Sequence, residues 1–381
     1  MALLALPPRT NGYGQHVGRA ILHVDLDQFI VAVELLRRPE LSGQPVIVGD
    51  EGDLTRRGVV AGASYEARAF GIRSGMPLRR AAARCHDLIC LPLDRDAYLA
   101  ASAAVMEILH AWPGVIVEEA GWDEAYLELD TSDPVRVARA VQFAVQDGTG
   151  LACSVGIGDN KLQAKSATAL GKPHGVARLS GATWARVMGP RGVEALFGIG
   201  AKTRRRLRAL GISTISELAD ADADLLAHHF GPKTGPHLRR IALGKGAMRV
   251  SPQPLPAHSY GHEITFQEDL ADPLVIADEV RKLAETVADE LGRKGRSAQR
   301  VIVTVRFAPF ETHSHGVAVE DADQPDAIVR AAMSAFAGFT RDGAVRLVGV
   351  RAELDMGDFV PTPPTRAPSA GEDGQEAQRQ P

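Results

Sequence analysis

The stretch that decides the fold is His23–Phe29, which reads HVDLDQF. Apolar and polar residues alternate over Ala20–Leu26, and this period of two predicts a strand. Asp25 and Asp27 then lie on one face, because successive side chains of a strand point to opposite faces. Two carboxylates on a buried face are costly unless a cation or a hydrogen-bond donor satisfies them. The stretch therefore predicts a strand that carries a charged site.

A second pair of carboxylates, Asp123 and Glu124, stands between the predicted strands Val115–Glu118 and Ala125–Leu129. Adjacent residues of a regular strand point to opposite faces, so both can serve one site only at a strand start or turn. Glu119–Trp122 supplies such a turn. Convergent carboxylates between strands suit hard divalent cations such as Mg²⁺, and two such ions can act in phosphoryl transfer. Taken alone, each aspartate could instead cap a turn.

The composition is that of an ordinary globular chain. With 381 residues, 45% hydrophobic and 24% charged, it predicts two or three domains and excludes collagen-like, fully disordered and membrane-spanning classes. The N-terminal MALLALPPRT lacks the basic lead of a signal peptide. Three cysteines without a CxxC pair predict free thiols in a reducing cytoplasm and give no support for structural zinc.

The predicted elements divide the chain. Up to residue 180 they run β-α-(small insertion)-α-β-β-α-β, which resembles a split βαβ arrangement with an antiparallel sheet. After residue 180, short helices with basic faces are predicted at 198–217 and 225–243, followed by a proline-rich linker at 246–257. A second small α/β domain follows at 274–354, and a disordered tail at 357–381.

Positive charge is concentrated although the net charge is −4. Residues 201–250 hold ten Lys and Arg against four acids, and residues 293–306 hold five cations and no acid. Local patches of one sign attract a polyanion even in a mildly acidic chain. Either patch alone could be a solvated helix face.

Five motifs follow one another along the chain: HVDLDQF, SYEARAFGIRSGMP, WDEAYLEL, SVGIGDNKLQAK and GKPHG, at 23–29, 64–77, 122–129, 154–165 and 171–175. The series resembles the Y-family DNA polymerases, most closely the DinB-like (polymerase IV) branch, from about residue 21 to 354. The resemblance implies a low-fidelity, DNA-directed DNA polymerase that copies damaged templates. It also implies an α+β right-hand fold with a ferredoxin-like palm, small fingers, a helix-hairpin-helix thumb and a C-terminal β-α-β-β-α-β little finger.

On this resemblance the chain begins with a disordered leader at 1–18, a palm at 19–36 and 94–180, and fingers at 37–93. A thumb at 181–247, a linker at 248–257, a little finger at 258–356 and a disordered tail at 357–381 follow. We expect a cytoplasmic monomer, associated with the nucleoid if bacterial, that binds primer-template DNA and dNTPs. The tail has no recognisable QLxLF-like peptide, so any sliding-clamp contact lies elsewhere or is absent. Two alternatives are a catalytically inactive polymerase-like scaffold in DNA repair and a non-catalytic DNA-binding module. The first predicts lost carboxylates, and the second leaves the N-terminal motifs unexplained.

The resemblance assigns catalysis and metal binding to Asp25, Asp123 and Glu124, with the backbone carbonyl of Leu26 as a further ligand. Asp27 matches a family residue that lies beside the metals without binding them. Two Mg²⁺ ions, for which Mn²⁺ can substitute, would activate the primer 3′-hydroxyl and neutralise the triphosphate of the incoming nucleotide.

For the nucleotide, the resemblance implies phosphate contacts from Tyr65, Arg68 and Lys172. Tyr65 and Arg68 are three residues apart and so share one helical face. Two departures stand nearby. Gly62 replaces a Thr that the family often has, which removes a hydroxyl donor near the triphosphate. Gly121 and Trp122 replace Ser and a small aliphatic residue, which reshapes the floor of the site.

The sugar gate is a further departure. In the family, a Phe or Tyr three residues after the second Asp lies under the sugar and excludes a 2′-hydroxyl; here that position is Ile30, with Phe29 one residue earlier. Three residues are nearly one helical turn, so Ile30 returns to the face of Asp27 while Phe29 turns into the core. Both belong to the predicted nucleotide site. An aliphatic wall rejects an added hydroxyl poorly, which predicts weak exclusion of ribonucleotides. Alternatively, Ile30 is ordinary core.

The DNA contacts implied by the resemblance are backbone and cationic groups in two segments. They are Gly198, Gly200, Lys202 and Thr203 in the thumb, and Arg293, Lys294, Arg296 and Arg300 in the little finger. Contacts of this kind bind phosphates without reading bases, so binding should fall steeply with salt.

Overall fold

The computed structural model describes residues 18–253, 257–320, 324, 326–340 and 343–354. The chain divides into two compact units, residues 1–255 and 256–381, and each is described by itself. The leader expected over 1–18 lies outside the described residues except for Gly18, which is instead the first residue of a strand. The tail expected over 357–381 also lies outside them.

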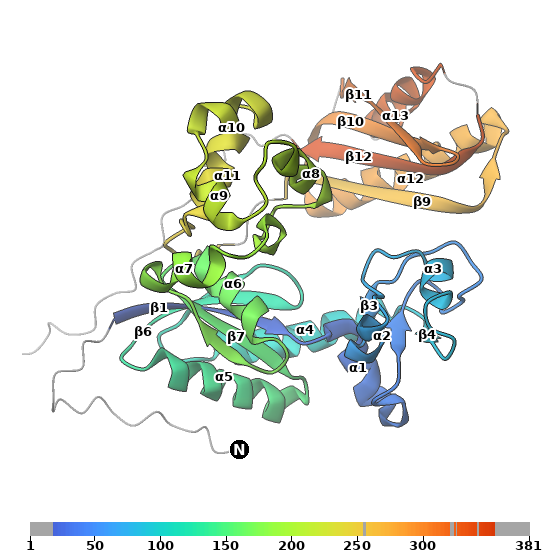
Figure 1. Ribbon diagram of the computed structural model, residues 1–381. Coiled ribbons are helices and arrows are strands. Elements are labelled where there is room, and N and C mark those ends of the chain that lie inside the picture. The colour runs from blue at the N-terminus through green and yellow to red at the C-terminus, as the bar shows by residue number, and fades with distance from the viewer. Residues whose placement is uncertain (1–17, 254–256, 321–323, 325, 341–342, 355–381) are drawn as a thin grey trace, which may run out of the picture. The chain divides into compact units, whose positions relative to one another are not determined.

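A five-stranded sheet forms the centre of the first unit (Figure 1). In spatial order its strands are β5 (Ile116–Glu119), β6 (Glu124–Thr131), β1 (Gly18–Leu26), β7 (Cys153–Gly158) and β8 (Val176–Arg178). β1 pairs antiparallel with both β6 and β7, whereas β8 adds to β7 in parallel. The expected antiparallel sheet is therefore present, and β8, which the sequence analysis did not identify, adds a parallel edge.

The two faces of this sheet are chemically different. Leu22, Val24 and Leu26 of β1 pack in one apolar cluster with side chains of the helices α4 (Arg95–His110) and α5 (Pro134–Thr149). The intervening residues point to the opposite face. That face meets the helix α6 (Lys161–Gly171), which contacts both β1 and β7. The alternation of β1 thus sends its apolar residues to α4 and α5 and its polar residues to α6.

A smaller part of this unit is inserted between β1 and α4. β1 leads into α1 (Phe29–Arg37) and a short 3₁₀ turn (Pro39–Leu41). The strands β3 (Gly62–Ala63), β2 (Val46–Val48) and β4 (Ile89–Leu91) then form a sheet in that order, covered by α2 (Tyr65–Ala69) and α3 (Leu78–Ala82). β3 is short, because only Gly62 and Ala63 pair with β2.

The basic region of the first unit is helical. It holds α7 (Gly181–Met188), a 3₁₀ turn (Val193–Ala195), α8 (Ala201–Ala209), α9 (Ile215–Asp220), α10 (Ala223–Phe230) and α11 (Thr234–Ala242). Four helices therefore fill the segments 198–217 and 225–243. Gly211, at φ 79°, turns the backbone after the end of α8. Thr214 and Glu217 then form the capping box that begins α9. Asp222 caps α10 in turn.

The chain that leaves α11 is fixed to the central sheet. The backbone N–H of Val250 donates to Glu128 at 2.9 Å, and that of Ser251 donates to Glu118 at 2.9 Å. Both carboxylates are buried on the face of β5 and β6. The first residues of the expected linker are therefore held by the first unit.

The second unit is a four-stranded antiparallel sheet with helices on one face (Figure 1). Its elements are β9 (Ser259–Leu270), α12 (Pro273–Lys294), β10 (Ala298–Phe307), β11 (Glu311–Ala318), α13 (Ala327–Ala337) and β12 (Val345–Leu354), and the strand order is β11-β10-β12-β9. This is the expected β-α-β-β-α-β order. Among the described residues, no helix is both long and apolar enough to span a membrane.

Gly156 allows α6 to approach the sheet closely. A Cβ at Gly156 would stand 2.0 Å from the Ala164 carbonyl oxygen and 2.3 Å from the Thr168 nitrogen. Because both obstacles are backbone, we expect Gly156→Ala to lower the free energy of unfolding by about 3 kcal/mol, the upper end for overpacking. Gly18→Ala in β1 faces open space and should change it by less than about 0.5 kcal/mol. Equal unfolding midpoints of the two variants in urea would contradict the close approach.

Candidate active site

Strand register brings the two pairs of carboxylates together. Asp25 of β1 lies directly opposite Glu124 of β6, and the Leu26 N–H donates to the Asp123 carbonyl at 2.9 Å. β6 begins at Glu124, so Asp123 belongs to the turn that precedes the strand. Because Asp123 is outside the regular strand, the alternation rule does not force it away from Glu124. Asp25, Asp123 and Glu124 therefore gather at one end of the sheet.

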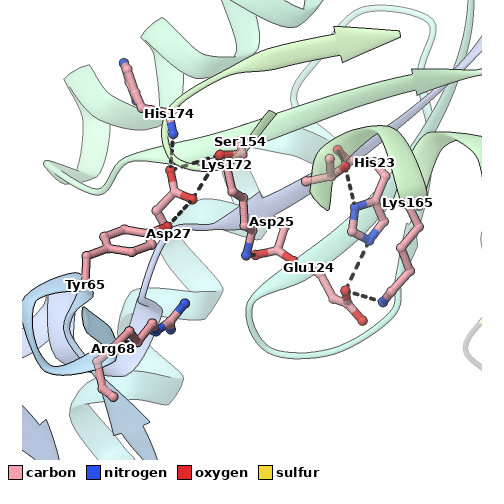
Figure 2. Close-up of polar contacts among 12 residues, drawn as sticks. His23, Asp25, Asp27, Tyr65, Arg68, Glu124, Ser154, Lys165, Lys172 and His174 are labelled. Carbon is pink, nitrogen blue, oxygen red and sulfur yellow. Dashed lines mark hydrogen bonds and ion pairs between the residues drawn. The ribbon is translucent and has the colours of Figure 1, made fainter. Parts of the chain in front are cut away.

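Lysine ammonium groups compensate part of this negative charge (Figure 2). Lys172 pairs with Asp25, and Lys165 pairs with Glu124 at 2.5 Å. The pKa of Glu124 is lowered to about 2, first by a hydrogen bond from His23 and then by Lys165. The pKa of Asp123 is raised, first by burial and then by the charges of Asp25 and Glu124.

The same groups fit a divalent cation. The cluster offers carboxylate oxygens, the ligands that Mg²⁺ and Mn²⁺ prefer. His23, Asp25 and Glu124 each offer one ligand atom, and these atoms lie within 4.8 Å of one another. Burial, and after it the charges of Asp25 and Glu124, disfavour the ionised form of Asp123 and raise its pKa. A cation between the carboxylates would stabilise that ionised form.

Asp27 has a different environment. β1 ends at Leu26, so Asp27 lies one residue beyond the strand, and its carboxylate is almost fully buried. It accepts hydrogen bonds from the Tyr65 hydroxyl at 3.0 Å, the Ser154 hydroxyl at 2.9 Å and the His174 N–H at 2.7 Å (Figure 2). These donors come from three separate segments. Asp27 therefore connects α2, β7 and the segment that follows α6. Among the described residues it has no lysine partner.

Tyr65 and Arg68 are set by the start of α2. Ser64 caps this helix by accepting from the Ala67 N–H at 3.1 Å. The Tyr65 hydroxyl hydrogen is committed to Asp27, and burial raises the pKa of this tyrosine. Arg68 donates through Nε to the Ala63 carbonyl at 3.0 Å, and its Nη groups make no hydrogen bond within the described chain. Arg68 is thus the freer of the two for an anion.

The predicted gate lies at the start of α1. Phe29 is 3% exposed and packs edge-on against Trp122, with ring centroids 6.0 Å apart. Its side chain therefore packs into the core, and a nucleotide contact from Phe29 stays a prediction. Ile30 is half-buried, and a Cβ added at Gly62 would stand 3.0 Å from the Ile30 Cβ. The two departures noted in the sequence, Ile30 and Gly62, are neighbours in space.

The glycines predicted to approach DNA lie just before the start of α8. Gly198 and Gly200 are exposed, and a Cβ on either would meet nothing within 4 Å, so their backbones are open to a ligand. Lys202 is exposed and Thr203 half-buried on the first turn of α8. The neighbouring Phe197 is 68% exposed, and its ring lies 4.3 Å from Lys165 Nζ.

In the second unit the predicted cations lie near the start of β10. Arg293 and Lys294 end α12, and Arg296 follows in the connection. Arg300 lies across Gly316, where a Cβ would stand 2.6 Å from its Nε. With Arg351 it lines a groove of about 610 Å³ on the sheet face. Arg351 was not predicted, although it lies in the second predicted domain, at 274–354.

Three buried polar residues around the carboxylates were also missed. His23, Ser154 and Thr168 are each at most 1% exposed. His23 could have been found, since it alternates with Asp25 on the polar face of β1. Ser154 and Thr168 carry no such sequence signal, because their partners lie more than a hundred residues away.

Comparisons with known proteins agree with this geometry. The model of the impB/mucB/samB family matches residues 24–169, and that of the family's C-terminal domain matches residues 257–354. The chain belongs to this family, the Y-family DNA polymerases, in the DinB-like polymerase IV branch. The expectation from the sequence motifs is thereby confirmed.

The similar proteins extend over nearly the whole chain. DNA polymerase IV 2 of Mycobacterium tuberculosis (strain ATCC 25618 / H37Rv) is 47% identical over 341 residues, which cover 88% of this chain and 98% of that protein. DNA polymerase IV of Methanoculleus marisnigri is 36% identical over 342 residues, with coverage of 88% and 94%. These relatives make the chain a DNA-directed DNA polymerase by class.

Solved structures confirm the fold. The Y-family DNA polymerase chimera Dbh-Dpo4(243-245)-Dbh matches with a TM-score of 0.77 at 23% identity, covering 88% of this chain and 98% of that one. An insertion ternary complex of Dbh DNA polymerase matches with a TM-score of 0.58 at 24% identity, with the same coverage. The expected α+β polymerase fold with a C-terminal little finger is therefore confirmed.

Proposed function

We propose that this polymerase extends DNA primers by two-metal-ion catalysis, with Asp25, Asp123 and Glu124 as catalytic carboxylates and metal ligands. One observation carries this proposal: Asp25 lies opposite Glu124 in the β1–β6 register with Asp123 beside it. The Leu26 carbonyl is a further proposed ligand, Mg²⁺ the proposed ion and Mn²⁺ a substitute. The retained carboxylates disfavour the inactive-scaffold alternative.

Within this mechanism, bound divalent cations would make the primer hydroxyl more acidic and offset charge on the transferred phosphoryl group. The chain's own residues supply position and further positive charge. The Nη groups of Arg68 are placed for charge-assisted hydrogen bonds to phosphate oxygens. Lys172 can exchange its ion pair with Asp25 for a phosphate of the nucleotide. No covalent enzyme intermediate is needed, because catalysis rests on positioning and charge.

DNA is held, in this proposal, through its phosphates. The exposed hairpin of Gly198 and Gly200 with Lys202 and Thr203 would bind backbone phosphates through N–H and side-chain groups. The cations at 293–300 would do the same from the little finger. One similar structure is described as an insertion ternary complex, which fits a substrate pair of primer-template and nucleotide. We further propose that the protein is a cytoplasmic monomer that uses dNTPs. It should also accept rNTPs, because Ile30 excludes them less strongly than an aromatic gate residue would.

The carboxylates give the most direct test. We expect Asp25→Ala, Asp123→Ala and Glu124→Ala each to reduce primer extension with Mg²⁺ or Mn²⁺ at least about 100-fold, because each offsets charge where it develops. Asp130→Ala changes an exposed acid on the same strand as Glu124 and should extend like wild type. Near-normal extension by Asp123→Ala would rule out its assignment, and an inactive wild type would favour the scaffold.

Arg68 and Tyr65 should differ in their effect on nucleotide use. Arg68 can form hydrogen bonds to phosphate that contribute about 1.5–3 kcal/mol, because donor and acceptor are charged. The Tyr65 hydroxyl already donates its hydrogen to Asp27, so its loss should affect nucleotide use less. We therefore expect Arg68→Ala to lower kcat/KM for dNTP about 10- to 100-fold and Tyr65→Phe about 5-fold, with the Kd for primer-template unchanged. Arg80→Ala, an exposed arginine on α3, is the control. The assignment fails if Arg68→Ala weakens DNA binding and leaves nucleotide use intact.

Ile30 should set sugar selectivity. We expect wild type to incorporate ribonucleotides readily and Ile30→Phe to raise the dNTP-to-rNTP ratio of kcat/KM at least about 10-fold, because the ring fills space beside C2′. Ile30→Leu keeps an aliphatic wall and should leave the ratio near that of wild type. Strong selectivity in the wild type that Ile30→Phe does not change would show that Ile30 is not the gate.

A further inference from the structure

His23 is a buried imidazole beside the carboxylates to which the proposed mechanism gives no role. Its side chain is fully inaccessible and lies on the polar face of β1 (Figure 2). Nδ1 is 2.9 Å from the Thr168 hydroxyl, and Nε2 is 3.1 Å from Glu124 Oε2. The ring also packs against Tyr126, with centroids 4.7 Å apart. The imidazole is therefore held from three sides.

The hydrogen bonds of this group define its tautomer. The Glu124 carboxylate can only accept, so the 3.1 Å contact requires a proton on His23 Nε2. Nδ1, on the other side of the ring, lies 2.9 Å from the Thr168 hydroxyl. The opposite tautomer would direct a nitrogen lone pair at a carboxylate oxygen, which is repulsive.

The Thr168 hydroxyl has three possible hydrogen-bond acceptors within reach. Besides His23 Nδ1, its Oγ1 lies 3.0 Å from the His23 carbonyl oxygen and 3.1 Å from that of Ala164. When Oγ1 donates to Nδ1, the ring N–H is left on Nε2, where it meets Glu124. The hydroxyl on α6 thus orients the ring on β1.

The two oxygens of Glu124 are used differently. Oε2 is shared by His23 Nε2 and Lys165 Nζ. Oε1 makes no hydrogen bond to any residue in the described part of the chain. One oxygen is therefore tied to the protein, and the other is free to bind a cation.

We propose that His23 and Thr168 are positioning residues that fix Glu124 through Oε2 and leave Oε1 for the metal, an inference that rests on the proposed metal site. Residues that orient a metal ligand typically change metal affinity or activity about 10- to 100-fold when they are lost. His23 itself is not a ligand in this arrangement, because Nε2 carries the proton and has no free lone pair.

The test measures binding of Mn²⁺ alone to the full chain by electron paramagnetic resonance, without DNA or nucleotide. We expect Thr168→Val to raise the Kd for Mn²⁺ about 10-fold, because valine keeps the shape but has no hydroxyl. Thr168→Ser restores the hydroxyl and should return the Kd to within about 3-fold of wild type. His23→Phe removes the donor to Glu124 and gives a second variant with the same expected weakening.

A matched control separates positioning from a general loss of stability. Tyr98→Phe also removes one buried hydroxyl, which donates to Glu34 at 2.9 Å. It should lower Tm by an amount similar to Thr168→Val and leave the Kd for Mn²⁺ unchanged. If the Thr168→Val or the His23→Phe variant folds and its Kd for Mn²⁺ equals that of wild type, the positioning role is overturned.

Glu124→Ala distinguishes this inference from the proposed function. If Glu124→Ala binds Mn²⁺ as wild type does, the metal site itself is misassigned. If Glu124→Ala weakens binding and neither Thr168→Val nor His23→Phe does, the metal site stands and the positioning role is wrong. A ¹⁴N coupling of bound Mn²⁺ that is lost in His23→Phe would show direct coordination, which also overturns the positioning role.

Discussion

The site depends on the register of β1 between β6 and β7. Because β1 pairs on both sides, its alternation is fixed at every residue from Ile21 to Asp25. A slip of one residue would turn Leu22 and Val24 toward α6 and send His23 and Asp25 into the apolar cluster. Burial of the leucine and valine side chains therefore also places the carboxylate of Asp25 opposite Glu124. Apolar packing on one face positions the charges on the other.

The carboxylates at the end of β1 and the start of β6 differ in their partners. Asp27 is satisfied by hydroxyl and backbone donors, which are fixed by the fold. Asp25 and Glu124 are instead paired with lysine side chains, whose long stems can move. The first arrangement stabilises the junction of several segments. In the second arrangement, a bound cation can join or replace the lysines in neutralising the carboxylates.

Much of the site could be predicted from sequence because its signals are local. The alternation in HVDLDQF and the turn before Glu124 depend on a few consecutive residues, and they placed the carboxylates at strand ends. The pairing of His23 with Thr168 spans 145 residues, so no local pattern contains it. The residue pattern missed β8, β9 and β11 for a related reason, although the family resemblance supplied the order that contains β9 and β11. β8 is only three residues long, and β9 and β11 are mostly exposed, so none shows a clear apolar alternation.

Lys165 links two regions that sequence motifs describe separately. Its ammonium group lies between Glu124 Oε2 and the exposed ring of Phe197 in the glycine hairpin. Under the proposed arrangement a cation would bind Oε1 of Glu124, so the ammonium group would keep both Oε2 and the aromatic ring as neighbours. Phe197 is thus electrostatically coupled to the carboxylates through one shared side chain. A substitution at Phe197 would therefore change both the exposed surface of the hairpin and the surroundings of the ammonium group that pairs with Glu124.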